Sequence, residues 1–412
     1  MCPQDAWEEI ALTQARAISP ANPWEKMMGK SLTDQATTHQ DVPDVSLIIP
    51  TRNEAATICE CIERAKQVFL KMGLEGEILV SDSSTDDTPN LARSCGARVI
   101  KPDKLGYGNA YLAGFDQARG DYIVMMDGDL TYDPGDMESM ISLLQGGQCD
   151  LVMGSRLKGR ILPGAMPALH RYIGNPVLTW ILNLLFSAGI SDAHCGLRAI
   201  TRPALKNLGL RSGGMEFASE MLIEAAGMNL RICEVPIVYH PRKGASKLNS
   251  FTDGWRHLRF MMLYRPAPFL LFPGLLAIIL GLLLAVEVYL SDGSRMHSMI
   301  LGGLLVIIGY QMLLGGLYFR AFAAFYRQTR SGRIKRLTSY HSLEKELLLG
   351  ILLLAAGVAV GGTVLLSWGA SGFGALYAAQ SAMMAMILCI LGIQTLFSGT
   401  FISLLLLQSS QD

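Results

Sequence analysis

Two aspartates separated by one glycine end an apolar run in the segment "IVMMDGDLTYDP". They are Asp127 and Asp129. Carboxylates at this spacing suit either a divalent cation or an ordinary polar turn, because Asp and Gly are common turn residues. Two more polar clusters also follow apolar runs, "PTRNE" at residues 50–54 and "SDSSTDDT" at residues 81–88. The elements that carry the three clusters decide between the two interpretations.

Apolar runs alternate with amphipathic segments from residue 45 onward. We predict strands at residues 45–50, 77–82, 97–100, 121–127 and 150–155. We predict helices at residues 54–72, 86–95 and 107–119, and a further helix after Pro134. This alternation predicts a doubly wound, parallel sheet, in which ligands bind beyond the carboxyl ends of the strands.

The three polar clusters therefore belong at one edge of the predicted sheet. Clustered carboxylates repel one another unless a cation lies between them. Mg²⁺ or Mn²⁺ held by one or two carboxylates usually completes its shell with substrate phosphates. The sequence thus predicts a metal and a nucleoside diphosphate at this edge. A P-loop is absent, and "GYGNAYLAG" at residues 106–114 lacks the dinucleotide fingerprint, which disfavours a hydride-transfer enzyme.

Composition separates a polar part of the chain from an apolar part. The 412 residues carry 35 basic and 35 acidic side chains, so a nucleic-acid partner is not indicated. The mean hydropathy of +0.31 comes mainly from long apolar runs in the last third. The 8 cysteines are scattered, with Cys59 and Cys61 the only close pair, and they predict reduced thiols without a disulfide or zinc framework.

Four apolar runs reach the roughly 20 residues needed to cross a bilayer. They cover residues 268–290, 298–325, 347–368 and 376–407. The connection "YRQTRSGRIKRLTSYHSLEKE" is rich in Lys and Arg, whereas "SDGSRMHS" and "SWGASGFG" carry one basic residue and none. This bias predicts an integral membrane protein whose polar domain and both termini are cytoplasmic.

The chain therefore divides into four parts. We predict a polar N-terminal extension at residues 1–43 without a signal peptide, an α/β domain at 44–240, a juxtamembrane amphipathic segment at 241–267 and a transmembrane region at 268–412. Residues 169–190 are also apolar, but they lie between two soluble motifs and predict an interfacial helix. The two amphipathic segments would hold the strand-end crevice at membrane level.

Eight motifs occur in the order that inverting glycosyltransferases of family 2 show. They are "SLIIPTRNEAATI", "SDSSTDDT", "GYGNAYLAGF", "DGDLTYDP", "MGSR", "DAHCGLRAI", "GMEFASEML" and "PRKGASKL". Over roughly residues 44–265 the chain resembles the polyprenyl-phosphate sugar synthases, of which dolichol-phosphate mannose synthase is one type. The resemblance implies an α/β nucleotide-sugar domain of GT-A type, with a mixed, mainly parallel sheet, followed by the four-helix transmembrane region.

The resemblance also implies roles for individual residues. Those expected to bind the nucleotide-sugar are Pro50, Asn53, Glu54, Asp82, Gly106, Asp127, Glu216 and Lys247, with Glu220 beside Glu216 facing the sugar. Those expected to hold Mg²⁺ or Mn²⁺ are Asp127 and Asp129, and the catalytic residues are Asp129, Asp192, Arg156 and Arg198. Those expected at the acceptor phosphate are Arg156, Arg198, Arg242 and Lys243.

Several of these residues have simpler interpretations. Asp82 alone would suit a strand-end cap, and Glu216 with Glu220 a solvated helix face. "PRKGASK" would suit a basic patch that attracts anionic lipid. Two positions depart from the family pattern: Ser81 replaces an acid, and Thr131 replaces a glutamine that often adds a metal contact.

The predicted reaction is an inverting, metal-dependent transfer of one hexose, mannose or glucose, at the cytoplasmic membrane face. The donor would be GDP-mannose or UDP-glucose, and the acceptor a polyprenyl phosphate. A processive polysaccharide synthase is one alternative, but its Q-x-x-R-W motif is missing, and Trp255-Arg256 is the reverse order. A transporter or flippase for a lipid-linked sugar, and a non-catalytic membrane scaffold, are the others.

Overall fold

A computed structural model describes residues 42–243, 250–290, 295–327, 343–374 and 378–408 of the chain. Lys247, both chain termini, almost all of the predicted N-terminal extension and most of the basic connection lie outside these ranges. The predictions made for those segments therefore remain predictions.

The described part of the chain contains a seven-stranded sheet in the order β3-β2-β1-β4-β6-β5-β7. The strands are β1 (Val45–Thr51), β2 (Gly76–Asp82), β3 (Arg98–Ile100), β4 (Tyr122–Met125), β5 (Leu151–Ile161), β6 (Arg198–Thr201) and β7 (Ile232–Tyr239). Strand β6 runs antiparallel to β4 and β5, and the other pairs are parallel. The sheet is therefore mixed and mainly parallel.

Strands β6 and β7 were not predicted as strands from the apolar pattern. Strand β6 has only four residues and directly follows a polar loop. Strand β7 contains Glu234 and Pro236 and lies at the edge of the sheet, where proline is tolerated because no ladder hydrogen bond is lost. Its pairing with β5 extends β5 to Ile161, beyond the predicted end at residue 155.

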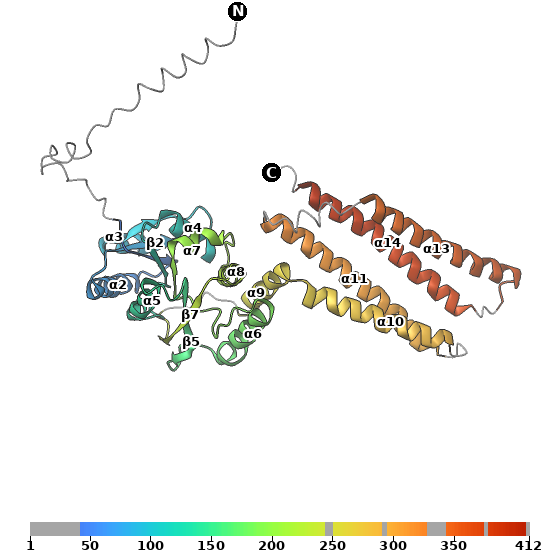
Figure 1. Ribbon diagram of the computed structural model, residues 1–412, viewed down its shortest axis with the longest axis horizontal. Coiled ribbons are helices and arrows are strands. Elements are labelled where there is room, and N and C mark those ends of the chain that lie inside the picture. The colour runs from blue at the N-terminus through green and yellow to red at the C-terminus, as the bar shows by residue number, and fades with distance from the viewer. Residues whose placement is uncertain (1–41, 244–249, 291–294, 328–342, 375–377, 409–412) are drawn as a thin grey trace, which may run out of the picture. The chain divides into compact units, whose positions relative to one another are not determined.

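Helices cover both faces of the sheet (Figure 1). They are α2 (Ile58–Met72), α3 (Thr88–Ser94), α4 (Tyr107–Gln117), α5 (Met137–Gln145), α6 (Asn175–Phe186), α7 (Arg202–Leu208), α8 (Phe217–Gly227) and α9 (Ser250–Tyr264). Side chains alternate along β1, so Leu47 and Ile49 pack in a core with α2 and α5, whereas Ile48 packs in a second core with α4 and α8.

Helix α2 begins at Ile58, four residues later than predicted. Glu54 and Thr57 form a turn in which the Thr57 amide donates to the Glu54 carbonyl at 3.0 Å. The Thr57 hydroxyl donates to the Gly128 carbonyl at 2.7 Å. This turn ties the loop after β1 to the segment after β4, which places two of the three polar clusters next to each other.

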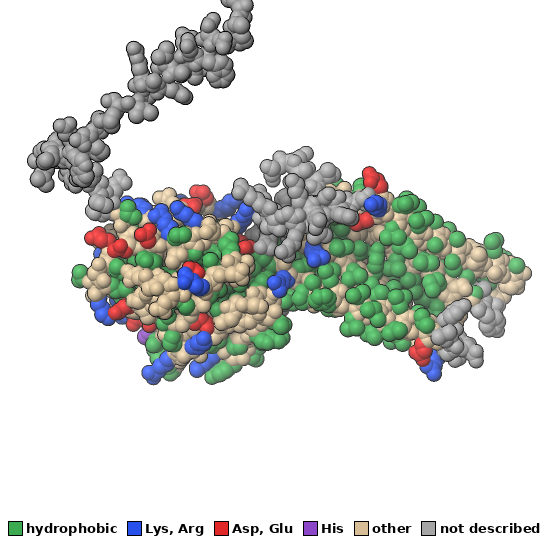
Figure 2. Space-filling model, in the orientation of Figure 1, with side chains coloured by type: hydrophobic (Ala, Val, Ile, Leu, Met, Phe, Trp, Pro, Cys, Tyr) green, Lys and Arg blue, Asp and Glu red, His purple; other side chains and the backbone are tan. Residues whose placement is uncertain are grey.

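Four described helices are long and apolar enough to cross a membrane. They are α10 (Phe272–Leu290), α11 (Met296–Arg327), α13 (Leu343–Ala370) and α14 (Ala379–Gln408). Their face in Figure 2 is largely covered by hydrophobic side chains, and Leu283, Leu352 and Leu366 are among the exposed ones. Apolar surfaces of this kind are stable in a lipid bilayer, because apolar side chains need not be buried away from hydrocarbon.

Glycines let the membrane helices approach closely. A Cβ atom added at Gly281 of α10 would lie 2.5 Å from the Gly302 carbonyl oxygen of α11. One added at Gly357 of α13 would lie 2.6 Å from the Cys389 sulfur of α14. Gly361 has only an ordinary contact, with Ala385. Gly357 therefore needs its small size at this contact, whereas Gly361 does not.

We expect Gly281→Leu to destabilise the α10–α11 pair, because the added side chain meets backbone atoms that cannot move aside. Overpacking of this kind costs about 1–3 kcal/mol. Gly362→Leu in α13 is the matched control, since a Cβ there meets no atom within 4 Å. Thermal unfolding in detergent should show a lower midpoint for the first variant alone, and equal midpoints would refute the close contact.

Two disulfides correct the prediction that all cysteines are reduced thiols. Cys59 pairs with Cys95 and Cys149 with Cys233, with Cα–Cα distances of 5.8 and 6.0 Å. The partners are 36 and 84 residues apart in sequence, so their proximity depends on the fold. The predicted orientation is unaffected, because it was drawn from the Lys and Arg bias and not from the cysteines.

Candidate active site

Three strand ends meet at one edge of the sheet. Thr51 at the end of β1 pairs with Asp82 at the end of β2, and its hydroxyl donates to the Asp82 carboxylate at 2.7 Å. The Asp127–Asp129 segment follows β4, which pairs with the other side of β1. The structure thus brings the three polar clusters together, as parallel strands require.

In the loop after β4, Thr131 holds the Asp129 carboxylate. Asp129 is 5% exposed, and its Oδ1 accepts hydrogen bonds from the Thr131 amide at 3.1 Å and the Thr131 hydroxyl at 2.6 Å. Leu130 has φ 61°, which turns the chain sharply between Asp129 and Thr131. Thr131, which stands where the family often has glutamine, thus orients Asp129. Gly128 packs tightly against Ile49 of β1.

The electrostatics of the aspartate pair favour a cation. Burial, and then the neighbouring Asp129 carboxylate, raise the pKa of Asp127 to about 7. Two carboxylates this close stabilise each other's protonated form or a shared cation. No group of three or more His, Cys, Asp or Glu side chains that could hold a metal occurs among the described residues. Two carboxylates completed by phosphate oxygens and water are what Mg²⁺ or Mn²⁺ accepts, so the donor set fits such an ion.

The loop after β2 lies against the loop after β1. The Asn53 side-chain oxygen accepts from the Thr85 backbone amide at 2.8 Å. The Asn53 backbone amide donates to the Ser84 hydroxyl at 2.7 Å. The Asp82 carboxylate accepts from the Ser84 amide at 3.2 Å. Asn53 and Asp82 therefore shape this loop as well as facing the edge. Pro50 is half-buried at the end of β1.

Ser81 stands one residue before Asp82 in β2. It is fully buried, and adjacent side chains of a strand point to opposite faces. The Ser81 side chain therefore points to the opposite face from Asp82, and it does not reach the strand-end edge.

Gly106 directly precedes α4 and lies beside a loop from another part of the chain. Its φ is 146°, and a Cβ atom there would lie 2.2 Å from the Gly213 carbonyl oxygen. The same carbonyl accepts from the Asn109 amide at 3.1 Å. Glycine is required at residue 106 because neither this backbone angle nor this close approach admits a side chain.

The Glu220 carboxylate holds that neighbouring loop. It is 2% exposed and accepts from the amides of Arg211 and Ser212, at 2.8 Å from the latter. Both Glu220 oxygens thus accept from backbone amides, and its place beside the sugar stays a prediction. Glu216 is half-buried just before α8, and its role stays a prediction.

Arg156 and Asp192 form a buried ion pair. Arg156 Nε and Nη2 donate to the two Asp192 oxygens at 2.7 and 2.8 Å, and the Arg156 guanidinium lies 5.2 Å from the centre of the Tyr239 ring. The Asp192 side chain is 0% exposed. Asp192 thus positions Arg156, and a catalytic role of its own stays a prediction. Arg156 remains the candidate phosphate ligand.

Arg198, predicted at the acceptor phosphate, is held by backbone carbonyls in this structure. It is 2% exposed, and its guanidinium donates to the carbonyls of Ala193, Cys195 and Ala218 at 2.9–3.0 Å. A buried guanidinium with three backbone partners supports the loop that carries Asp192. Removing it to bind phosphate would leave those carbonyls unpaired.

Arg242 and Lys243 were also predicted at the acceptor phosphate, but both pair with acids at the β1–α2 side. Arg242 Nη2 donates to Glu54 Oε1 at 2.8 Å, and its Nε lies 3.3 Å from Asp129 Oδ2. Lys243 pairs with Glu60 of α2 at 3.0 Å, where both side chains are exposed. The geometry places Arg242 beside the candidate metal site.

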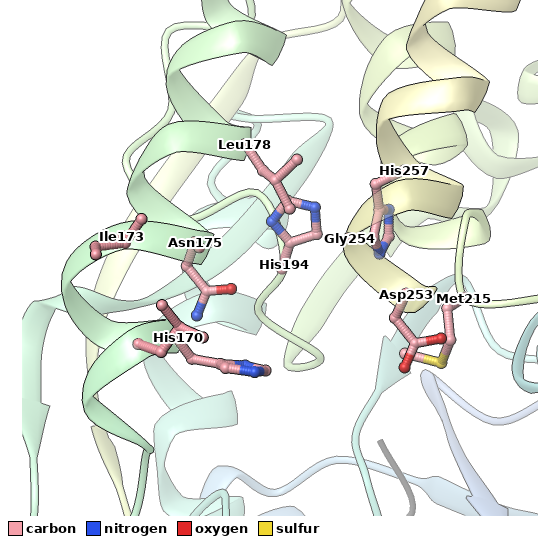
Figure 3. A pocket seen from close by; sticks show the side chains of 11 residues that line it. His170, Ile173, Asn175, Leu178, His194, Met215, Asp253, Gly254 and His257 are labelled. Atoms are coloured by element: carbon pink, nitrogen blue, oxygen red, sulfur yellow. The ribbon is translucent and has the colours of Figure 1, made fainter. Parts of the chain in front are cut away.

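A pocket that sequence reasoning missed lies between α6 and α9. It has a volume of about 310 Å³, and Figure 3 shows His194 between the two helices, with His257 and Asp253 on α9. Its lining is mainly apolar. It includes Leu169, which directly precedes the short π-helix η2 (His170–Gly174), and Ile173, which lies within that helix. The two amphipathic segments were predicted, but their contact with the "DAHCGLR" loop depends on the fold.

Three histidines line this pocket, and two of them, His194 and His257, lie against each other. Their rings meet edge to face, with centroids 4.4 Å apart, and the His257 Nδ1 lies 2.8 Å from the Ser219 hydroxyl. Burial, followed by the charge of Arg198, lowers the pKa of His257 to about 4. Burial, followed by His257 and Arg156, lowers the pKa of His194 well below its usual value.

The low pKa of His257 predicts a loss of stability in acid. The unfolded chain binds a proton as pH falls below about 6.5, whereas the folded chain does so only near pH 4, so stability declines across this window. At pH 5 the loss amounts to about 2 kcal/mol. We expect His257→Gln to reduce the drop in unfolding midpoint between pH 7.5 and 5. An unchanged drop would contradict the assignment, and the pH 7.5 midpoints control for loss of the Ser219 hydrogen bond.

Comparison with known proteins identifies the family. The profile described as Glycosyl transferase family 2 matches residues 46–209, and that of the Glycosyltransferase family 2 C-terminal transmembrane region matches residues 321–406. The low-salt glycan biosynthesis hexosyltransferase Agl6 of Haloferax volcanii is 42% identical over 365 residues, which cover 87% of this chain and 88% of that protein. The chain belongs to glycosyltransferase family 2.

Two further similarities are to shorter parts of this glycosyltransferase. The dolichyl-phosphate hexose transferase of H. volcanii is 31% identical over 219 residues, covering 53% of this chain and 92% of that protein. The crystal structure of glucosyl-3-phosphoglycerate synthase from Mycobacterium tuberculosis with Mn²⁺, uridine diphosphate and its product has a TM-score of 0.44 and 21% identity, covering 53% of this chain and 79% of that one.

The family and the enzyme class predicted from the sequence are thus confirmed. This chain is a glycosyltransferase of family 2, with a mixed, mainly parallel GT-A-type sheet followed by four apolar helices. The positioning roles of Asp192, Arg198 and Glu220 were missed. Their residue types suggest substrate contacts, and only the fold shows the partners that hold them.

Proposed function

We propose that this glycosyltransferase transfers one hexose from a nucleotide-sugar to a polyprenyl phosphate, with inversion and with Mg²⁺ or Mn²⁺ bound. The observation that carries the proposal is the aspartate pair at the strand-end edge, with its neighbouring carboxylates and raised Asp127 pKa. The name of the dolichyl-phosphate hexose transferase from H. volcanii supports the lipid acceptor.

Asp127 and Asp129 would hold the metal ion, which when bound stabilises the departing diphosphate as a Lewis acid. The acceptor phosphate is already an anion and needs little help from a general base. The protein's task is therefore to hold it in line with the anomeric carbon and to neutralise its charge. Arg156, oriented by Asp192, is the candidate for the second task, since arginine binds phosphate oxygens well.

The apolar pocket between α6 and α9 suits the lipid part of the acceptor. It lies beside His194, two residues after Asp192, so a chain seated there would start near Arg156. Large apolar side chains of η2 and α6 are exposed, including Tyr172, Ile173 and Trp180. Such a surface favours insertion into the lipid headgroup region, where aromatic side chains are stable.

We also propose that the catalytic domain faces the cytoplasm. The Lys and Arg residues of the connection between α11 and α13 support this orientation. Cysteine labelling with an impermeant reagent in intact cells, at single cysteines placed in the two other connections, tests it. Labelling at both positions supports the proposal, and protection of both would overturn it.

The reaction is tested with the purified full-length protein, Mg²⁺ or Mn²⁺, polyprenyl phosphate, and labelled GDP-mannose or UDP-glucose in parallel. A labelled lipid carrying one hexose is the expected product, and the donor that yields it identifies the sugar. No labelled lipid with any donor, from folded protein, would overturn the proposal. A long labelled polymer would instead indicate a processive synthase.

A further inference from the structure

The Arg242 side chain bridges two acids that come from distant parts of the chain. Its Nη2 donates to Glu54 Oε1 at 2.8 Å, and its Nε lies 3.3 Å from Asp129 Oδ2. The Arg242 side chain is 23% exposed, and those of Glu54 and Asp129 are 9% and 8% exposed. A positive charge therefore already lies against one of the two proposed metal ligands.

The Asp129 oxygen nearest Arg242 is also the one available to a metal ion. Thr131 occupies Oδ1 with both its amide, at 3.1 Å, and its hydroxyl, at 2.6 Å. Oδ2 thus remains as the oxygen that a cation would take. A metal ion and the Arg242 guanidinium compete for one atom, and they repel each other as like charges.

The hold of Arg242 on Asp129 is incomplete. Its buried Nε makes no hydrogen bond among the described residues, although it lies within ion-pair distance of Oδ2. A buried donor left without a hydrogen bond carries a free-energy cost, which a better-placed acceptor would remove. The phosphate oxygens of a nucleoside diphosphate are acceptors of that kind, and arginine binds them strongly.

We propose that Arg242 is an internal counter-ion of the metal site. Its guanidinium balances Asp129 and Glu54 in the free protein, and it opposes metal binding until a nucleotide diphosphate offers it a new partner. Metal and nucleotide then bind cooperatively, each raising the affinity for the other by the same factor. The inference rests on the proposed metal-dependent function and adds to it that the metal ion and the nucleotide bind cooperatively.

The test measures Mn²⁺ binding by electron paramagnetic resonance, with the full-length protein in detergent and no nucleotide. An opposite charge within about 4–6 Å lowers the affinity of a carboxylate for a proton about tenfold or more. We therefore expect Arg242→Gln to bind Mn²⁺ about tenfold more tightly than the parent protein. Lys243→Gln is the matched control, because it removes the same charge from the next residue, which pairs with exposed Glu60. Its Mn²⁺ affinity should equal that of the parent.

A second measurement repeats the Mn²⁺ titration with GDP and with UDP. We expect the nucleotide that binds to raise the Mn²⁺ affinity of the parent, and to raise that of Arg242→Gln several-fold less. Arg242→Lys keeps the charge and should behave like the parent in both titrations. Unfolding midpoints establish that each variant is folded.

The outcomes separate the inference from the proposed function. A folded Arg242→Gln variant that binds Mn²⁺ no more tightly than the parent overturns the counter-ion role, even if the parent makes the lipid product. Failure of every variant to bind Mn²⁺, with or without nucleotide, overturns both. Tighter binding by Arg242→Gln supports the inference whichever sugar is transferred.

Discussion

Asp129→Asn is expected to reduce hexose transfer by about three orders of magnitude or more while leaving the protein folded. The substitution removes the charge of the carboxylate that Thr131 orients. A bound metal contributes several kcal/mol to the stabilisation of transition-state charge, and about 4 kcal/mol corresponds to a thousandfold in rate. Transfer of labelled hexose to polyprenyl phosphate measures the rate, and the unfolding midpoint shows that the fold is intact.

Asp133→Asn is the matched control for this variant. Asp133 belongs to the same segment, but its carboxylate accepts from the Gly135 amide at 2.9 Å, at the start of a short helix. An asparagine can cap in the same way, so transfer should stay within a few-fold of the parent rate. Near-normal transfer by Asp129→Asn would remove this residue from the proposed metal site.

Asp192→Asn is expected to cause the largest loss of stability among these variants. It leaves the Arg156 guanidinium buried with no opposite charge, and breaking a buried pair in this way costs about 3–5 kcal/mol. For a domain of this size the unfolding midpoint should fall by roughly 10 °C. Transfer should fall as well, because Arg156 loses the two oxygens that orient it.

Two further variants separate stability from catalysis. Asp150→Asn breaks a similar pair with Arg231, whose side chain is 58% exposed, and should cost less than about 1 kcal/mol. The double variant Asp192→Leu with Arg156→Met removes both charges, so much of the stability should return while transfer stays low. Recovery of transfer together with stability would show that Arg156 has no role at a phosphate.

Sequence patterns were sufficient for the features that depend on neighbouring residues. The strands β1 to β5 were predicted because an apolar run bounded by polar residues indicates a buried strand. The "DGD" segment was placed at a strand end for the same reason, and the membrane helices followed from run length alone. Ordered motifs then indicated the glycosyltransferase family.

The roles of charged side chains could not be derived from those patterns. Arg198 and Arg156 both follow a glycine-containing motif, yet one is held by three backbone carbonyls and the other by a carboxylate. A charge can be buried only where partners surround it, and the partners come from other elements. Residue type therefore suggested a phosphate contact for both; both are buried, and only their partners distinguish them.

The sequence by itself determined the family, the class of reaction and the two aspartates proposed to hold a metal. The tertiary structure alone decided which distant residues meet: Glu54 and Arg242 are 188 residues apart in the chain, and Arg156 and Asp192 are 36 apart. The physical reason is the distance along the chain over which each kind of interaction acts. Apolar period and turn chemistry act over a few residues, whereas ion pairs, disulfides and pockets require segments that only the folded sheet and its helices bring together.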